Sequence, residues 1–156
     1  MPRRLRSIFA VSLAVVVITA AHAAMADPGN EIAYRRATER ALGGHMSALG
    51  TILSGRIRKG NADIIIHAQA IGNIGKLFHT LFPKGTDKGK TRAKPDIWTK
   101  PAEFQKALID FKQASAALAG VAGKGNPNTT KAAYKAVVKT CGSCHKQFRH
   151  PRPPAQ

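Results

Sequence analysis

The chain has 156 residues, and its 25 lysines and arginines against 8 aspartates and glutamates give a formal net charge of +17 at pH 7. This length favours a single domain, and so basic a surface suggests acidic partners or an anionic membrane face. Nucleic acid is disfavoured as a partner because aromatic residues make up only 6% of the chain and no nucleic-acid-binding motif is present.

Residues 1–26 have the composition of a secretory signal peptide. Three arginines between positions 3 and 6 precede an apolar run over 8–21, and small residues suited to cleavage follow at Ala23 and at Ala26. The apolar run is shorter than the roughly 18–20 residues that a membrane-spanning helix needs. We therefore expect cleavage near Ala26, a periplasmic location and no integral membrane anchor.

Two helical segments are expected next, at about 29–58 and 62–81. Asn61 is expected to cap the second segment, and Pro83 ends it. Apolar residues recur in both segments at intervals of three, four and seven, which is the period of a helix packed along one face. Glu39 is the one charged residue on the stripe of the first segment, whose other members are Ile32, Leu42, Met46, Leu49 and Leu53.

A loop rich in lysine, glycine, threonine and proline is expected from Pro83 to Thr99, because this stretch has no apolar period. Ile97 and Trp98 are its apolar exceptions. We expect both side chains to hold the loop against the core, since a tryptophan in such a loop is more often a packing residue than a chemical one.

The last two helical segments are expected after this loop. The third begins near Pro101, a favourable first-turn residue, and ends in the glycines of 120–125. Asn128 is expected to cap the fourth. Because no segment alternates like a strand, the sequence predicts an all-α, antiparallel four-helix bundle over residues 27–150. A proline-rich, disordered tail is expected over 151–156.

The only two cysteines lie in the fourth helical segment, in Cys141-Gly142-Ser143-Cys144-His145. C-x-x-C-H is the attachment signature of a c-type haem. Helix positions i, i+3 and i+4 share one face, so both thiols can form thioethers with the vinyl groups along one porphyrin edge. The imidazole of His145 can then bind the iron axially. The sequence therefore predicts one covalent haem c per chain, attached to the C-terminal helix.

Three other interpretations of the motif are a disulfide, a redox C-x-x-C pair and half of a zinc site. A zinc site needs a second ligand pair, and a thioredoxin-like site needs surrounding strands; the sequence offers neither. Export favours the haem, because bacterial c-type haem is attached outside the inner membrane. We expect Trp98 to cover one edge of this haem as well as to pack on the core.

Five short motifs follow one another along the chain. They are Tyr34-Arg35-Arg36, Gly43-Gly44-His45-Met46, Leu49-Gly50, Lys94-Pro95-Asp96-Ile97-Trp98, and Cys141 to Phe148 with Arg149. In order and spacing they resemble the class II c-type cytochromes, the cytochrome c′ and cytochrome c-556 family. The resemblance covers essentially the whole chain after the signal peptide. It implies covalent haem at Cys141 and Cys144, with His145 as the proximal iron ligand.

The resemblance also implies roles for two arginines. Arg35 stands where the family places a first-helix arginine that pairs with a haem propionate; the alternative is a solvated helix charge. Arg149 lies one turn after His145, where the family often has a basic residue beside the proximal face; the alternative is a charge of the tail. Family members often dimerise through their first two helices, and Gly43-Gly44 would permit such a contact.

The sequence departs from the family on the distal side of the haem. The c-556 branch has a methionine as sixth iron ligand four residues after the first-helix arginine, and that position is Glu39 here. We expect Glu39 first to pair with Arg35 or Arg36 or to turn outward, second to hydrogen-bond a distal water, and third to bind ferric iron. Met46 is expected to pack in the core. His45 is expected at the surface or in a helix contact, and His67 and His79, which could bind iron in principle, are expected to be structural.

Two functions fit these features. The first is periplasmic one-electron transfer, with an acidic redox protein as partner. The second is a high-spin haem protein that binds nitric oxide or carbon monoxide at an open distal site, which Glu39 in place of methionine favours. An enzyme is disfavoured because no acid, base or nucleophile set is evident beyond the haem.

Overall fold

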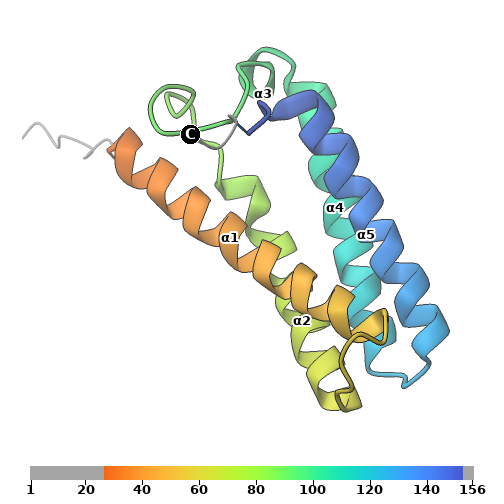
Figure 1. The fold of residues 1–156 in the computed structure, drawn as a ribbon. Coiled ribbons are helices and arrows are strands. Elements are labelled where there is room, and N and C mark those ends of the chain that lie inside the picture. Colours follow the sequence, from red (N-terminus) through yellow and green to blue (C-terminus); the bar gives the residue numbers. More distant parts are fainter. Residues whose placement is uncertain (1–26, 153–156) are drawn as a thin grey trace, which may run out of the picture.

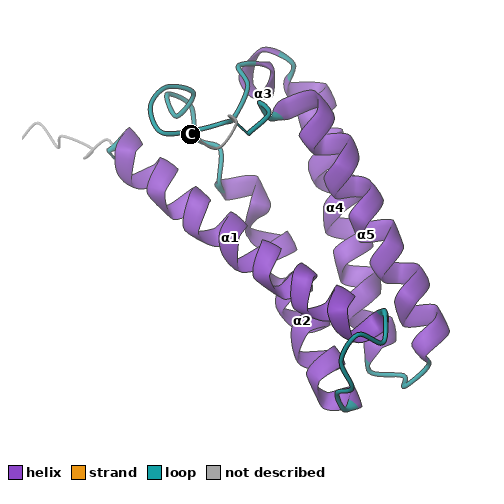
Figure 2. Ribbon diagram, viewed as in Figure 1, coloured by secondary structure: helices purple, strands orange, loops and turns teal. Residues whose placement is uncertain are grey.

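The computed structural model describes residues 27–152, in which four long helices form a bundle (Figures 1 and 2). These helices are α1 (Pro28–Leu53), α2 (Asn61–Leu77), α4 (Pro101–Ala122) and α5 (Pro127–Phe148). Two short elements lie between them, the 3₁₀ turn η1 (Phe78–Thr80) and the one-turn helix α3 (Asp96–Thr99). The predicted all-α bundle is confirmed.

Both ends of the chain fall outside this description. The predicted signal peptide over 1–26 and the last four residues of the predicted tail lie outside the described residues. Within residues 27–152, no helix combines the length and the apolar character needed to cross a membrane.

Two predicted features of the turn between α1 and α2 are wrong. The first helix ends at Leu53, earlier than expected, because Gly55 takes a positive φ of 76° that glycine adopts at little cost. Asn61 is not the cap of α2 but its first residue, since Gly60 occupies the cap position. The turn that begins at Ser54 thus ends the helix about one turn before the predicted end of the segment.

The cap of α5 also differs from the prediction. Asn126, not Asn128, is the capping residue, and its side-chain oxygen accepts hydrogen bonds from the backbone N–H groups of Asn128 and Thr129 at 3.0 and 3.2 Å. Pro127 follows as the first helical residue, where its missing N–H costs nothing. This start fixes the register of the helix that carries the two cysteines.

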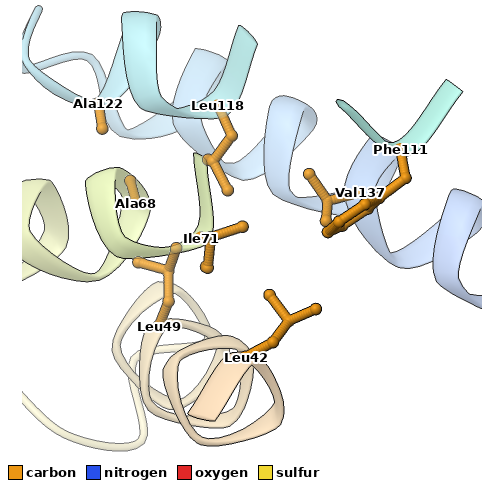
Figure 3. Packing of buried hydrophobic residues seen from close by; sticks show 8 residues of the cluster. All are labelled: Leu42, Leu49, Ala68, Ile71, Phe111, Leu118, Ala122 and Val137. Atoms are coloured by element: carbon orange, nitrogen blue, oxygen red, sulfur yellow. The ribbon is translucent and has the colours of Figure 1, made fainter. Parts of the chain in front are cut away.

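All four long helices contribute to one buried core (Figure 3). Side chains such as Leu49 and Val137 have no exposed surface, as the predicted apolar stripes require. The core explains why α1, α2, α4 and α5 stay together, since burial of apolar surface is the main favourable term in folding. Its buried members are Leu42, Leu49, Ala68, Ile71, Phe111, Leu118, Ala122 and Val137.

Helices α2 and α4 approach each other closely at Gly72. A Cβ atom on Gly72 would lie 2.9 Å from the Cβ of Ala119 and 3.3 Å from the backbone oxygen of Ser115. At Gly43 and Gly44 no other part of the described chain comes close, because a Cβ on either residue would meet nothing within 4 Å.

The two helix pairs diverge at one end of the bundle (Figure 1). Helix α1 packs mainly on α2, and α5 packs mainly on α4. Contact between α1 and α5 is sparse and includes Tyr134, whose hydroxyl donates to the backbone oxygen of Met46 at 3.0 Å. Towards the beginning of α1 and the end of α5 the two helices move apart. The side chains that line the region between them form the site described next.

Candidate haem site

A cavity of about 940 Å³ lies between α1, the loop before α3 and the last turns of α5. All three reactive side chains of the C-x-x-C-H motif, Cys141, Cys144 and His145, line it. Its volume is at the upper end of the range for small-molecule sites. The apolar part of the wall is formed by Leu42, Met46, Phe78, Phe82, Ile97, Phe104, Val138 and Phe148. Cationic side chains also line the cavity: Arg35, Arg36, Arg40, Lys90, Arg92, Arg149 and Arg152.

The two cysteines present half-buried thiols to this cavity and form no disulfide. Burial raises the pKa of Cys141. Burial also raises the pKa of Cys144 to about 11, with further contributions from the nearby charges of Cys141 and Glu39. Both shifts favour the protonated thiols, and the free state of both cysteines gives no support to the disulfide interpretation. Among residues 27–152 no group of three or more His, Cys, Asp or Glu side chains could hold a metal ion, so the half-zinc interpretation gains no partner.

The side chain of His145 is held beside Arg149, as the sequence predicted for these two residues. Nη1 of Arg149 lies 3.0 Å from Nε2 and 3.3 Å from Nδ1 of the imidazole. Burial, with a smaller effect from the charge of Arg92, lowers the pKa of His145. A neutral imidazole is the form that binds a metal, so the surroundings favour the ligand form of this side chain.

Glu39 projects from α1 into the cavity. The side chain is exposed to solvent, and partial desolvation against the cavity wall raises the pKa of Glu39. The charges of Arg35, Arg92 and Arg36 act in the opposite direction and do not overcome it. Two ion pairs are formed within the described residues, Lys100–Asp96 and Lys106–Asp110. The expected pairing of Glu39 with Arg35 or Arg36 is therefore not formed; Glu39 is an exposed residue of the cavity wall.

Arg35 is almost completely buried, with 1% of its surface exposed. Its guanidinium donates four hydrogen bonds to the segment after η1 and lies 5.0 Å above the centroid of the Phe82 ring. The acceptors are the backbone oxygens of Leu81 and Thr86 and the hydroxyls of Thr86 and Thr91, at 2.8–3.3 Å. The alternative of a solvated helix charge is wrong. Since a guanidinium has five N–H donors, most of the donors of Arg35 bind the loop that forms one end of the cavity.

Trp98 does not line the cavity, and Ile97 takes the place expected for it. The indole N–H donates to the backbone oxygens of Phe82 and Pro83, both at 3.2 Å, which directs the ring towards the loop. That Trp98 covers a haem edge stays a prediction, because the lining of the cavity does not include its side chain. Its predicted packing role is confirmed, because Ile97 and Trp98 belong to a second apolar cluster around Phe104.

The remaining candidate ligands divide into two groups. Met46 lies on the cavity wall and also packs against the core, so the structure gives it both positions. His45 and His67 instead bind each other between α1 and α2, with their Nδ1 atoms 3.0 Å apart. His79 Nδ1 lies 2.8 Å from the backbone oxygen of Lys76. None of these three histidines lines the cavity.

Several cavity residues were missed from the sequence. Phe82 and Arg92 come from the loop, where no periodicity signals which side chains face inward. Val138 and Tyr134 belong to the apolar stripe of α5, and their position before the cysteines on the same face was the available signal.

Comparison with known proteins tests the interpretation of this cavity. A family model described as "Cytochrome C'" matches residues 30–149, which are nearly all of the described chain. The chain belongs to the cytochrome c′ family. It is accordingly a class II, haem c-type cytochrome. An apolar cavity that carries two free thiols, an imidazole and several cationic side chains fits a haem, whose macrocycle is apolar and whose propionates are anionic.

Curated relatives agree with this assignment. The chain is 36% identical over 125 residues to the cytochrome c′ of Pararhodospirillum photometricum, covering 80% of this chain and 99% of that protein. It is 34% identical over 145 residues to the cytochrome c′ of Rhodospirillum rubrum, covering 91% and 95%. It is 32% identical over 114 residues to the cytochrome c-556 of Rhodopseudomonas palustris, covering 69% of this chain and 74% of that protein.

Solved structures show the same fold. The cytochrome c′ of Shewanella frigidimarina superposes with a TM-score of 0.78 at 28% identity, covering 81% of this chain and 99% of that one. The cytochrome c′ of Rubrivivax gelatinosus superposes with a TM-score of 0.77 at 28% identity, covering 80% and 98%.

Proposed function

We propose that this cytochrome transfers single electrons on one covalently attached haem c in the periplasm. The observation that supports it is the convergence of Cys141, Cys144 and His145 on one large apolar cavity. When bound, the haem iron supplies the one-electron chemistry by alternating between ferric and ferrous states.

Each group of residues around the cavity then has a separate role. The two cysteines hold the group as thioethers, and His145 is the proximal ligand, oriented by the neighbouring Arg149. Apolar side chains from α1, α4 and α5 exclude water and lower the local dielectric. Cations on the cavity wall, Arg40 and Lys90 among them, compensate the charge of the haem propionates. No enzymatic activity is proposed.

An acidic redox protein is the partner that best fits the chain, because the chain stays strongly basic after removal of the three arginines of the predicted signal peptide. Association with such a partner slows as ionic strength rises. A homodimer is also part of the proposal: a related cytochrome c′, 28% identical with a TM-score of 0.77, is described as having an unusual ligand-controlled dimer dissociation. In this chain the surface of α1 around Gly44 is open and accessible to a second copy.

A second function is favoured by Glu39. The c-556 type of methionine ligand is absent from that position, and the carboxyl that replaces it faces the cavity with a raised pKa. No strong sixth ligand is therefore evident on this side of the cavity. The alternative is thus a high-spin haem that binds nitric oxide or carbon monoxide on its distal side, next to Glu39.

Absorption and EPR spectra of the ferric protein test both functions together. A high-spin wild type that becomes low-spin in Glu39→Met, with no change in Glu31→Met, would support a distal site at Glu39. Glu31 is a matched control because it lies on α1 but not on the cavity wall. A wild type with the sulfur-to-iron charge-transfer band of methionine ligation would overturn the second function.

Two further measurements test the remaining parts of the proposal. Intact mass of the exported protein should equal the chain from Asp27 plus one haem, and Cys141→Ala or Cys144→Ala should reduce the attachment. Stopped-flow reduction by an acidic electron donor should slow with added salt; a rate independent of salt would contradict basic docking.

A further inference from the structure

A second, smaller recess of about 350 Å³ lies next to the haem cavity, where the end of α5 meets the loop before α3. Arginines and lysines form most of its wall, two histidines complete the polar part, and no acidic side chain contributes to it. Apart from one proline, the lining residues are Arg92, Lys94, His145, Lys146, Arg149 and His150.

Backbone hydrogen bonds build this recess from two distant segments. The N–H of Lys94 donates to the oxygen of Phe148 at 3.0 Å, and the N–H of His150 donates to the oxygen of Arg92 at 2.8 Å. These bonds flank an isolated antiparallel bridge between Ala93 and Arg149. Nζ of Lys94 also donates to the backbone oxygen of Lys146 at 3.2 Å. The cations are therefore brought together by a fixed backbone and not by flexible side chains alone.

The charges of the recess are not neutralised by the protein. Within residues 27–152 the ion pairs are Lys100–Asp96 and Lys106–Asp110, and neither uses a cation of the recess. Asp96 is close enough for Lys94 to lower its pKa, but its carboxylate is hydrogen-bonded to Lys100. The carbonyl end of the α5 dipole, with a fraction of one charge, favours cations here, and Glu39 and Asp96 act on Arg92 and Lys94 without forming an ion pair with them. Like charges repel each other at such short range, so a bound anion would relieve the repulsion.

We propose that this recess binds a small oxyanion of the phosphate class. Arginine and lysine side chains converging on one point form short, charge-assisted hydrogen bonds to phosphate oxygens. The volume holds one tetrahedral oxyanion with its ordered water and is small for a larger ligand. Binding itself does not depend on the electron-transfer function proposed above.

An anion in the recess would also act on the haem. Arg92, His145 and Arg149 line both the recess and the haem cavity, so the anion lies beside the proximal ligand. A negative charge at this position stabilises ferric iron relative to ferrous iron, and it lowers the reduction potential. This second consequence rests on the proposed haem function.

Calorimetric titration of the haem-loaded protein with inorganic phosphate, at constant ionic strength, tests the proposal. Wild type should show saturable binding of one phosphate. The variant Lys94→Gln/Lys146→Gln should bind about tenfold more weakly for each cation removed. The variant Lys131→Gln/Lys135→Gln is the matched control, because it removes two exposed lysines from the first half of α5. It should bind as wild type does.

Two results would overturn the proposal. Equal affinity for all three proteins would mean that phosphate responds to net charge only. Binding of hexaglutamate that depends on Lys94 and Lys146, without binding of phosphate, would make the recess a docking point for an acidic protein instead. Circular dichroism before each titration shows that the variants fold. In redox titrations phosphate should lower the potential of wild type and control but not of the Lys94→Gln/Lys146→Gln variant. Electron transfer to an acidic donor is measured separately, so its failure is distinguishable from failure of phosphate binding.

Discussion

Replacing Arg35 with alanine is expected to lower the free energy of unfolding by about 3 kcal/mol. The guanidinium donates four hydrogen bonds to the segment from Leu81 to Thr91. Bonds from a charged donor contribute about 1.5–3 kcal/mol each, or about 6–12 kcal/mol for four. Desolvation of a buried charge without an anionic partner costs several kcal/mol and cancels the larger part. About 3 kcal/mol remains, equivalent to a decrease in Tm of about 6–12 °C.

Denaturant unfolding of the haem-loaded protein, followed by circular dichroism, measures this change. Arg36→Ala is the matched control, because Arg36 is the next residue of α1 and is exposed; its loss should cost less than about 0.5 kcal/mol. Thr91→Val removes one acceptor, and its effect should be non-additive with Arg35→Ala in a double-mutant cycle. If Arg35→Ala destabilised no more than Arg36→Ala, or if the cycle showed no coupling, the role of Arg35 in holding the loop would be refuted.

Three further predictions concern the helix contacts and the cavity. Gly72→Ala should lower the free energy of unfolding by about 2 kcal/mol, because the new Cβ would overlap Ala119 and the backbone of Ser115. Gly44→Ala, whose Cβ would meet nothing within 4 Å, should raise it by about 0.5–1 kcal/mol. Equal shifts in Tm for the two variants would contradict the close approach of α2 and α4. In a double-mutant cycle, His45→Ala and His67→Ala should show a coupling of about 0.5–1.5 kcal/mol, since the two Nδ1 atoms share one hydrogen bond; purely additive losses would mean that the bond is not formed in solution. Burial raises the pKa of Glu39 above its ordinary value of 4.5, so the native state binds this proton more tightly than the unfolded state. The contribution of Glu39 to the free energy of unfolding should therefore fall as pH rises from 4.5 through the native pKa, and Glu39→Gln should gain stability relative to wild type over the same range; parallel stability curves against pH would argue against a buried carboxyl.

The bundle was predictable because its core obeys the helical period. Leu49 and Val137 stand on stripes that the sequence shows directly, and both are fully buried. Helix ends were less predictable because neighbouring residues compete for the same role. Asn126 and Asn128 are equally suited to cap α5, and only the position of Pro127 in the first turn decides between them.

The haem motif was predictable for a similar reason, since its spacing is local to one helix. Arg35 and Glu39 lie one turn apart on α1, and their surroundings depend on how the distant loop wraps around that helix. Trp98 and Ile97 are adjacent in a helix of four residues. Such a helix is too short to show a period, so the sequence could not reveal which of the two faces the cavity.

The segment from Leu81 to Thr91 sets the distance between α1 and the helix that carries the haem motif. Arg35 fastens α1 to this segment, and the bonds of Lys94 and His150 fasten its continuation to the end of α5. The span between these two attachment points therefore works as a spacer. Insertions or deletions within it would widen or narrow the Glu39 side of the cavity without changing Cys141, Cys144 or His145. Loop length thus offers evolution, or an engineer, a way to vary access to the iron while the covalent attachment stays the same.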